Sequence, residues 1–474
     1  MSKTSKSSLG NFDAHEDHII LPFGKKVAYG VGGATHMLMS NGIGQMTVIY
    51  TVIFGVDALI VGAVLFWPRM WDGISDVLMG HISDNTRTRW GRRRPYVLIG
   101  GLITAIVFPL MLMIPDAFSG REGTYLLLTS LIFYTAYTVF LVCYNALGME
   151  MSMDYNERSR VMAFRAWFAS AGMLLPFWSL YFMELDIFEN SIQGAKYYGW
   201  LVGIFGVITV LIVATRTREN AEVQAQDRIK VWDAFKYTFS NGKFLLLALG
   251  ILIFEIGLVV WIPLSSFVII YYVFGGDIKM GGLWGAMSAT TFALLKWFTV
   301  GPIAWIGTKI GKHKAFAIGL LLTGVGFGLT WFFYNPAYPI LILALQVLMI
   351  WALPAFEIFP YAIMADICDL DEYKTGLRRE GLFGSSLGFA QKMGVAASAL
   401  ITGIALSIAG FQEGVSVQTT EVLFNLRLAM VIVPGIFVLL SVVVLYFLRL
   451  PESEIRKIRE ILDQRRAEEE AGGP

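Results

Sequence analysis

Charged residues are scarce in this chain. Asp, Glu, Lys and Arg make up 15% of its 474 residues, and hydrophobic residues make up 56%. A soluble protein typically has about 25% charged and about 45–50% apolar residues. Apolar runs close to the ~20 residues that span a bilayer recur along the sequence, and the net charge of +1 offers no positive excess for binding nucleic acid. The composition therefore predicts a polytopic membrane protein with no nucleic-acid partner.

Cysteine is scarcer still. Cys143 and Cys368 lie far apart, within or at the edge of apolar runs, which predicts two reduced thiols rather than a disulfide. We find no metal-ligand spacing, no Ser/His arrangement and no phosphate-binding glycine loop, so we expect neither an enzyme nor a cofactor beyond a transported ion. The polar N-terminus lacks an apolar core, so we do not expect a cleaved signal peptide.

About twelve hydrophobic segments lie on the two sides of a charged central stretch. They are 27–50, 58–82, 96–117, 124–148, 161–184, 197–215, 244–273, 282–307, 314–334, 338–364, 385–410 and 423–448. These segments predict an all-α protein with twelve transmembrane helices. The predicted units are an N-terminal segment (1–26), a six-helix bundle (27–215), a central loop (216–243), a second six-helix bundle (244–449) and a tail (450–474). We expect the charged tail to begin as a helix and then fray, and Pro354 and Pro360 to break the tenth span.

Lysine and arginine gather in alternate loops. The basic positions are Lys25, Lys26, Arg87, Arg89, Arg92, Arg93, Arg94, Lys309, Lys312 and Lys314. The positive-inside rule then places both termini in the cytoplasm. A weak repeat relates GHISDNTRTRWGRRRP after the second segment to IGTKIGKHKA after the eighth. Two halves of six spans with such a repeat point to the major facilitator architecture.

Three ionised residues lie within the second segment: Arg69, Asp72 and Asp76. Each costs at least ~2.5–3.5 kcal/mol at bilayer depth, which indicates a functional role. The two aspartates are four residues apart, so both project from one helix face. Neighbouring carboxylates repel unless a cation or proton lies between them. We therefore predict a cation site at Asp72 and Asp76; the alternative is a structural ion pair with Arg69.

Four motifs in order resemble the glycoside–pentoside–hexuronide:cation symporters, the melibiose permease group of the major facilitator superfamily. They are RMWDGISD with DNTRTRWGRRRP, ALGMEMSMDYNERSRVMAFR, MADICDLDEYKTGLRREG and GFAQKMG. The resemblance covers most of the chain. It implies two six-helix bundles, alternating access, a bacterial inner-membrane location and coupling to Na⁺, H⁺ or Li⁺ at the paired aspartates.

By position, the resemblance gives Lys392 the role of the family's intramembrane lysine and places Arg165 near the substrate and cation sites. We predict a central charge network of Lys392, Arg165 and Arg69, in which two carboxylates opposite one lysine leave one negative charge for a cation. Lys392 would hold the aspartates when the cation leaves. The alternatives are a snorkelling lysine and an interfacial arginine.

The sequence departs from the family at the sugar-binding positions. The first helix reads GGATHMLMSN without a carboxylate, and the second sugar-binding aspartate has its counterpart near Leu141 and Asn145. Transport of an α-galactoside is therefore not expected. We predict a symporter of a sugar or glycoside, with Na⁺ favoured over H⁺. The alternatives are a sodium-coupled symporter of an amphipathic solute, since eukaryotic lysolipid transporters share these features, and a transporter-like sensor.

Polar and aromatic residues within the segments could line a substrate cavity. The candidates are Asn145, Tyr144, Tyr137, Trp167, Gln391, His36, Asn41 and Lys296. Helix packing is the competing interpretation of each. Glu255 and Glu357 are further intramembrane charges and candidates for inter-helix pairing.

Charged residues at the cytoplasmic ends of the segments predict ion pairs that close one side of the cavity. The expected gate residues are Asp84, Arg92, Arg93, Glu150, Arg158, Asp369 and Arg378. Such pairs must break when the cavity opens. We assume a monomer whose partners are a small solute, a monovalent cation and the lipid bilayer.

Overall fold

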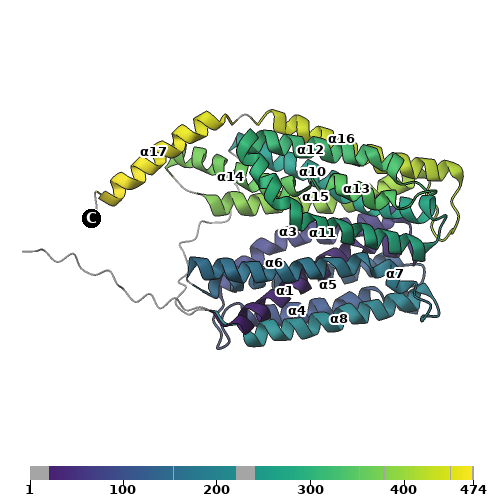
Figure 1. The fold of residues 1–474 in the computed structure, drawn as a ribbon. Helices are drawn as coiled ribbons and strands as arrows, with labels where there is room; N and C mark the ends of the chain where they lie inside the picture. The colour runs from purple at the N-terminus through teal and green to yellow at the C-terminus, as the bar shows by residue number, and fades with distance from the viewer. Residues whose placement is uncertain are drawn as a thin grey trace, which may run out of the picture.

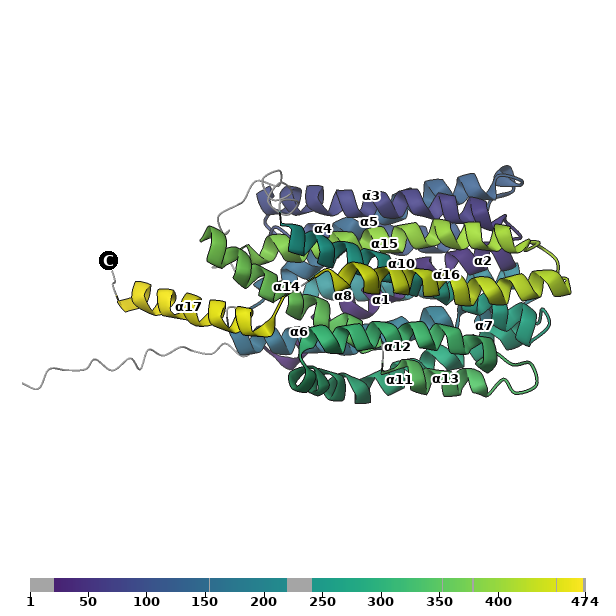
Figure 2. The ribbon, with the colours of Figure 1, turned by 90° about the horizontal axis from the view of Figure 1, so that it is seen from above.

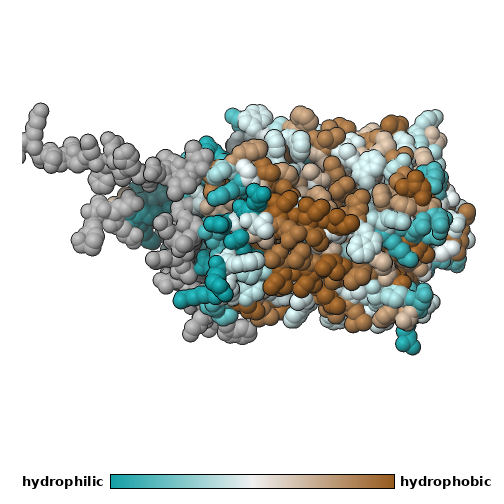
Figure 3. All heavy atoms as spheres, turned by 90° about the horizontal axis from the view of Figure 1, so that it is seen from below, coloured by the Kyte–Doolittle hydropathy of each residue, from teal (hydrophilic) through white to brown (hydrophobic). Residues whose placement is uncertain are grey.

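The structure is a computed structural model that describes residues 21–152, 154–219, 241–351, 353–376, 379–448 and 450–471. Every regular element among these residues is a helix, and the helices form two bundles lying side by side (Figure 1). Figure 3 shows hydrophobic side chains gathered across the middle of one face, with hydrophilic ones toward the ends. The predicted all-α membrane fold is therefore confirmed.

The first bundle holds the helices before the central stretch. They are α1 (Phe23–Gly44), α2 (Met46–Val52), α3 (Ala58–Asn85), α4 (Arg94–Met111), the 3₁₀ turn η1 (Asp116–Phe118), α5 (Glu122–Glu150), α6 (Tyr155–Phe177), α7 (Ser179–Met183) and α8 (Ser191–Arg216). Short breaks separate α1 from α2 and α6 from α7, so each pair makes one crossing. The bundle thus has six crossings.

The second bundle repeats this plan. It contains α10 (Gly242–Phe267), the π-helical turn η2 (Val268–Val273), α11 (Ile278–Ile310), α12 (Lys312–Phe333), α13 (Leu341–Met349), α14 (Leu353–Thr375), α15 (Glu380–Ala409) and α16 (Thr420–Tyr446). Helices α10 and η2 make one crossing, as do α13 and α14. A further helix, α17 (Glu452–Ala471), follows outside the bundle.

Nine helical stretches among the described residues are long and apolar enough to span a membrane by composition alone. The crossings that fail this test are α1, α3 and α6. These three helices carry most of the first-half candidate residues. The polar side chains that were predicted to form the site also lower the mean hydropathy of α1, α3 and α6.

Two details differ from expectation. The tail does not fray soon after its start, because α17 continues to Ala471 and buries Ile455, Ile458 and Leu462. The tenth span does break before Pro354, where α13 ends and α14 begins. Helix α14 then continues through Pro360, so the prediction of a second break there was wrong. A proline removes only one backbone hydrogen bond, and the remaining bonds keep this helix intact.

Glycines let the two bundles approach closely along α3 and α15, which run beside each other (Figure 2). A Cβ atom placed on Gly62 would lie 2.5 Å from the carbonyl oxygen of Ala399, and one on Gly403 would lie 2.5 Å from that of Ala58. Small residues are the usual means of close helix packing in membranes. This interface brings side chains of the two halves together.

Polar contacts also join the bundles at the end of the molecule opposite α17. Lys279 Nζ lies 2.7 Å from the Asp186 carboxylate, and the backbone N–H of Ala58 donates to Glu413 at 3.0 Å. Lys279 and Glu413 belong to the second half, whereas Asp186 and Ala58 belong to the first. The bundles are therefore tied together at this end.

Candidate functional site

Two aspartates of the first bundle share one lysine of the second. Lys392 Nζ on α15 lies 3.0 Å from Asp72 Oδ2 and 2.5 Å from Asp76 Oδ2 on α3. The Asp72 side chain is 0% exposed, whereas that of Asp76 is 30% exposed. The pair predicted from spacing and the lysine predicted from resemblance thus meet at one point, although 316 residues separate Asp76 from Lys392.

Arg69 supplies a second positive charge to this cluster. Its guanidinium lies 3.5 Å from Asp72 Oδ2, and its central carbon lies 5.3 Å from the centre of the Tyr134 ring on α5. The sequence interpretation left one unbalanced negative charge opposite a single lysine. With Arg69 included, two carboxylates face two cations. The formal charges of the cluster therefore balance.

Two hydroxyl groups that the sequence analysis missed complete the cluster. Thr138 Oγ1 on α5 donates to Asp72 Oδ1 at 2.7 Å, and Ser75 Oγ lies 3.0 Å from Thr138 Oγ1. Ser75 follows Asp72 by three residues, so helical spacing could have identified it. Thr138 lies in a separate apolar segment and gave no comparable signal.

The cluster offers oxygen atoms of the kind that hard cations prefer. Oδ1 of Asp76 is buried and has no hydrogen-bond partner, and Oδ2 of both aspartates contacts Lys392. A small cation placed among these oxygens would replace the ammonium group of Lys392. The geometry therefore permits an exchange between a mobile cation and a fixed one.

His36 and Arg165 lie beside the cluster. His36 Nδ1 on α1 is 2.6 Å from the hydroxyl of Tyr137, and Arg165, Arg69, Lys392 and Asp72 are close enough to act electrostatically on the His36 ring. Arg165 on α6 lies over the Tyr144 ring at 5.5 Å. No carboxylate of the described chain lies within ion-pair distance of Arg165.

Of the remaining cavity candidates in the first bundle, some make packing contacts or hydrogen bonds within the protein and others do not. Tyr144 is fully buried, stacks on Tyr29 at 4.6 Å and donates to its carbonyl oxygen at 2.8 Å, so it serves helix packing. Asn41 donates to the carbonyl oxygen of Met37 on its own helix. By contrast, Trp167 is 79% exposed, and Oδ1 of Asn145 is buried without a hydrogen-bond partner.

The second bundle contributes its own ion pair. Lys296 Nζ on α11 lies 2.5 Å from Glu357 Oε1 on α14, and their side chains are 26% and 56% exposed. Gln391 accepts a hydrogen bond from the Tyr361 hydroxyl at 3.1 Å. Glu255 differs, since its Oε2 is buried and has no hydrogen-bond partner.

The predicted gate residues pair within one bundle. Arg93 donates to Asp84 and Glu150, and Arg92 lies 2.9 Å from Glu150. Burial opposes the charge of Arg93, but the Glu150 and Asp84 carboxylates still raise its pKa above the ordinary value. These contacts hold α3, α4 and α5 together, so in this structure they do not close the space between the bundles.

The other three predicted gate residues do not pair across the two bundles among the described residues. Asp369 on α14 accepts from Arg459 on α17 at 2.7 Å, a partner that the sequence analysis missed. Arg158 donates to the carbonyl oxygen of Ser152 at 2.8 Å. Arg378 lies outside the described residues. The predicted set of gate residues therefore omitted Arg459, the partner that the C-terminal helix α17 supplies to Asp369.

The sequence is similar to a family of membrane transport proteins along most of its length. The family model described as "MFS/sugar transport protein" matches residues 28–452. The chain is 28% identical to "Glucuronide carrier protein homolog" of Escherichia coli (strain K12), covering 93% of this chain and 95% of that protein. It is 23% identical to "Sodium-dependent lysophosphatidylcholine symporter 1" of Gallus gallus, covering 94% and 89%.

A solved structure of nucleoside transporter NupG has the same fold, with a TM-score of 0.65 and 15% identity, covering 90% of this chain and 98% of that one. The match of the family model extends over nearly the whole helical core. This chain is therefore a multi-pass membrane transporter, not an enzyme, and it belongs to the MFS/sugar transport protein family, in the glycoside–pentoside–hexuronide:cation symporter group.

Proposed function

We propose that this protein is a symporter that couples the entry of a sugar or glycoside to the binding of Na⁺ at Asp72 and Asp76. The observation that carries this proposal is the shared contact of Lys392 with both carboxylates. A lysine from the opposite bundle occupies the position of a small cation. The same oxygens can then be satisfied either by the protein or by an ion from solution.

This exchange gives a physical basis for coupling. While Lys392 holds the aspartates, α15 and α3 are tied together by charge. When Na⁺ takes the carboxylate oxygens, Lys392 is released and the bundles become free to rearrange. A ligand shifts a conformational equilibrium only through its different affinity for the two states. Na⁺ and solute are coupled if both favour the state in which Lys392 is released.

The solute would bind beside this cluster. His36, Arg165 and Asn145 belong to the first bundle, and the Lys296–Glu357 pair belongs to the second. These groups can bond hydroxyls and carboxylates, which suits a glycoside or a hexuronide. The glucuronide carrier homolog is a relative of matching length and supports this class of solute.

A lysolipid is the second candidate. The lysophosphatidylcholine symporter is also a relative over most of the chain, and the first helix lacks the sugar-binding carboxylate of the melibiose group. Exposed aromatic residues such as Trp167 would suit an acyl chain. We further propose that the protein acts as a monomer in a bacterial inner membrane, with both termini cytoplasmic and no organic cofactor.

Uptake into proteoliposomes tests the proposal. Radiolabelled glycosides, hexuronides and a lysophospholipid would be offered with an inward Na⁺ gradient, with a pH gradient alone and with neither. We expect a glycoside or hexuronide to accumulate at least about tenfold more with Na⁺. Accumulation driven equally by a pH gradient would reject Na⁺ as the coupling ion, and uptake of the lysophospholipid alone would favour the second candidate.

A further inference from the structure

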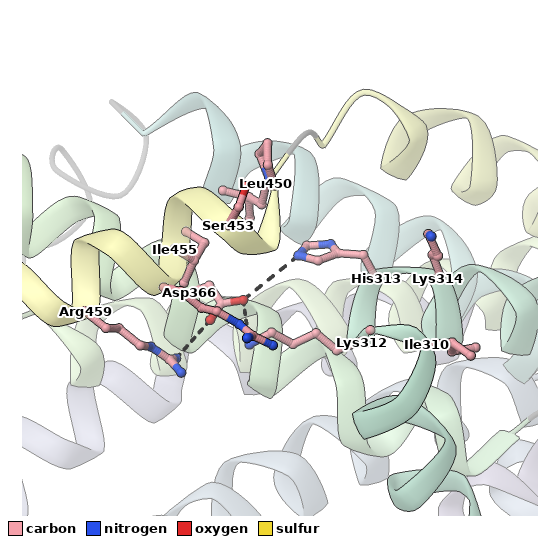
Figure 4. A pocket seen from close by; sticks show the side chains of 12 residues that line it. Ile310, Lys312, His313, Lys314, Asp366, Leu450, Ser453, Ile455 and Arg459 are labelled. Atoms are coloured by element: carbon pink, nitrogen blue, oxygen red, sulfur yellow. Dashed lines mark hydrogen bonds and ion pairs between the residues drawn. The ribbon is translucent and has the colours of Figure 1, made fainter.

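Buried carboxyl groups of the second bundle are held by positive side chains. Asp366 on α14 is the clearest case, because Lys312 Nζ lies 2.5 Å from its Oδ2 and Arg459 lies 3.0 Å from its Oδ1, as Figure 4 shows. Asp371 on the same helix is paired with Arg379 at 2.6 Å. Burying a carboxyl group without such a partner is costly, so an exception calls for an explanation.

Glu255 on α10 is that exception. Its Oε2 atom is buried and accepts no hydrogen bond, and no cation of the described chain lies within ion-pair distance of its carboxyl group. The sequence predicted inter-helix pairing for this residue, and the described residues do not provide it. The carboxyl group therefore retains its capacity to accept hydrogen bonds from a bound molecule.

The side chain of Glu255 lies beside the aspartate cluster. Its stem packs on α15, where a Cβ atom placed on Gly394 would lie 2.8 Å from Glu255 Cβ and 3.1 Å from its Cγ. Gly394 follows Lys392 by two residues. Arg69 of the first bundle and Glu357 of the second are both close enough to act electrostatically on the Glu255 carboxyl group. The group therefore lies where the two bundles meet.

The polar side chains of this region are not sealed within the protein. Glu255 and Lys296 are partly exposed, and Glu357 and Tyr361 are exposed. All four belong to stretches that are long and apolar enough to cross a membrane. Charged side chains at bilayer depth almost always face the bundle interior or a water-filled space rather than lipid. A polar solute between the bundles could therefore contact them.

The neighbouring oxygen atoms already have partners. Glu357 Oε1 lies 2.5 Å from Lys296 Nζ, and the hydroxyl of Tyr361, which also lies within electrostatic reach of Glu255, donates to Gln391. A metal ion needs several oxygen ligands, and the positive charge of Arg69 opposes a second cation. A bound group that donates hydrogen bonds without carrying a positive charge suits Glu255 best.

We infer that Glu255 binds hydroxyl groups of the transported solute, an inference that rests on the proposed function. A carboxyl group accepts several hydrogen bonds, so adjacent hydroxyls of a sugar ring can donate to its two oxygens together. Glu255 and the Lys296–Glu357 pair then bind a polyhydroxylated solute from the second bundle. The inference favours a glycoside over lysophosphatidylcholine, whose headgroup ammonium has no hydrogen to donate.

Binding of glycosides to the purified full chain tests this role. Methyl β-glucoside, methyl β-xyloside and methyl β-glucuronide would be titrated in nonionic detergent at saturating Na⁺, with thermal stabilisation as the readout. Glu255→Gln keeps the size of the side chain but replaces an acceptor oxygen with an amide donor. Glu189→Gln makes the same change at an exposed residue before α8 and is the matched control.

We expect the half-saturating concentration of the glycoside that binds most tightly to rise at least about tenfold in Glu255→Gln and less than about twofold in Glu189→Gln, because a site that accepts a hydroxyl loses most when that contact is removed. The Na⁺ response without glycoside should stay within about twofold in both variants, since independent sites contribute separately. The unfolding midpoint without ligand should not fall, because Glu255 has no internal hydrogen bond to lose.

Monodeoxy derivatives of the same glycoside separate a direct contact from an indirect one. In the natural protein, removal of a hydroxyl that donates to Glu255 should weaken binding at least about fivefold. In Glu255→Gln the same removal should have little further effect, because the effects of two groups in contact are not additive. Additive losses for every derivative would show that Glu255 does not contact the solute, and would overturn the inference.

Failure of this inference differs from failure of the proposed function. Equal affinity of the natural protein and Glu255→Gln for a glycoside would reject the role of Glu255 and leave the transport proposal intact. If none of the three glycosides stabilises the natural protein, the sugar assignment fails and the role of Glu255 fails with it. If a glycoside binds but Na⁺ has no effect on the natural protein, the coupling ion is wrong, while the comparison of Glu255→Gln with the natural protein still decides this inference.

Discussion

Lys392 Nζ lies 2.5 Å from Asp76 Oδ2, and this contact joins α15 of the second bundle to α3 of the first. An ion pair at bilayer depth is costly to break without a replacement charge. The contact therefore links the two bundles in this arrangement, and in the function that we propose a cation would have to replace Lys392 at the carboxylate.

Asp72→Asn and Asp76→Asn test the cation site. Each substitution removes one negative charge while keeping the size of the side chain. We expect Na⁺ stimulation of uptake to fall at least about tenfold, equal to about 1.4 kcal/mol of lost coupling. Asp57→Asn is the matched control, because asparagine caps the N-terminus of α3 about as well as aspartate. Full Na⁺ stimulation in both site variants would refute the assignment.

Lys392→Gln tests the exchange between lysine and Na⁺. Without the ammonium group the carboxylates retain excess negative charge, so Na⁺ should bind more tightly. We expect the Na⁺ concentration for half-maximal thermal stabilisation to fall at least about fivefold, while net uptake is largely lost. An unchanged or higher Na⁺ requirement would show that Lys392 does not compete with the ion.

Gly62→Ala tests the close approach of α3 and α15. The added Cβ atom would lie 2.5 Å from the Ala399 carbonyl oxygen, so the helices must separate. We expect a lower unfolding midpoint and slower uptake, in the range of about 1–3 kcal/mol for overpacking. Gly285→Ala is the control, since nothing lies within 4 Å of that position. Equal behaviour of the two variants would contradict this packing.

Arg93→Gln tests the charge cluster at the end of the first bundle. The side chains of Arg93 and Glu150 are 8% and 9% exposed, so the substitution leaves a buried carboxylate with Arg92 as its remaining partner. We expect a loss of about 3 kcal/mol in stability, which is the lower range for a broken buried pair. Arg160→Gln, whose side chain is 56% exposed, should cost less than about 1 kcal/mol. Chemical denaturation of the purified protein compares them.

The helices and their order could be predicted with good accuracy from the sequence. The segment predicted at 124–148 is the helix Glu122–Glu150, and that predicted at 423–448 is Thr420–Tyr446. Apolar runs of bilayer length leave the backbone few alternatives to a helix, because its polar groups must be satisfied within the segment. Interruptions were less predictable, as the continuous helix through Pro360 shows.

The cation cluster was only partly predictable. Asp72 and Asp76 share a helix face by spacing alone, and Lys392 came from a family resemblance. The ion pair of Arg69 with Asp72 was foreseen as an alternative from their spacing of three residues. Thr138 was missed, because a hydroxyl partner from another helix depends on which helices are neighbours. Arg93 does pair with Asp84 and Glu150, but within one bundle, and Arg459 is a partner of Asp369 that local sequence did not reveal.

Hydropathy and helical periodicity are local properties, so the order of residues was enough to show that the chain crosses a membrane many times and that charges lie within those crossings. The tertiary structure decided which charges meet. Contacts such as Lys392 with Asp76, or Arg459 with Asp369, depend on helix packing between distant parts of the chain. Only that packing shows that Arg69 and Lys392 together face the two carboxylates, which is the reason our proposal requires a cation to displace the lysine.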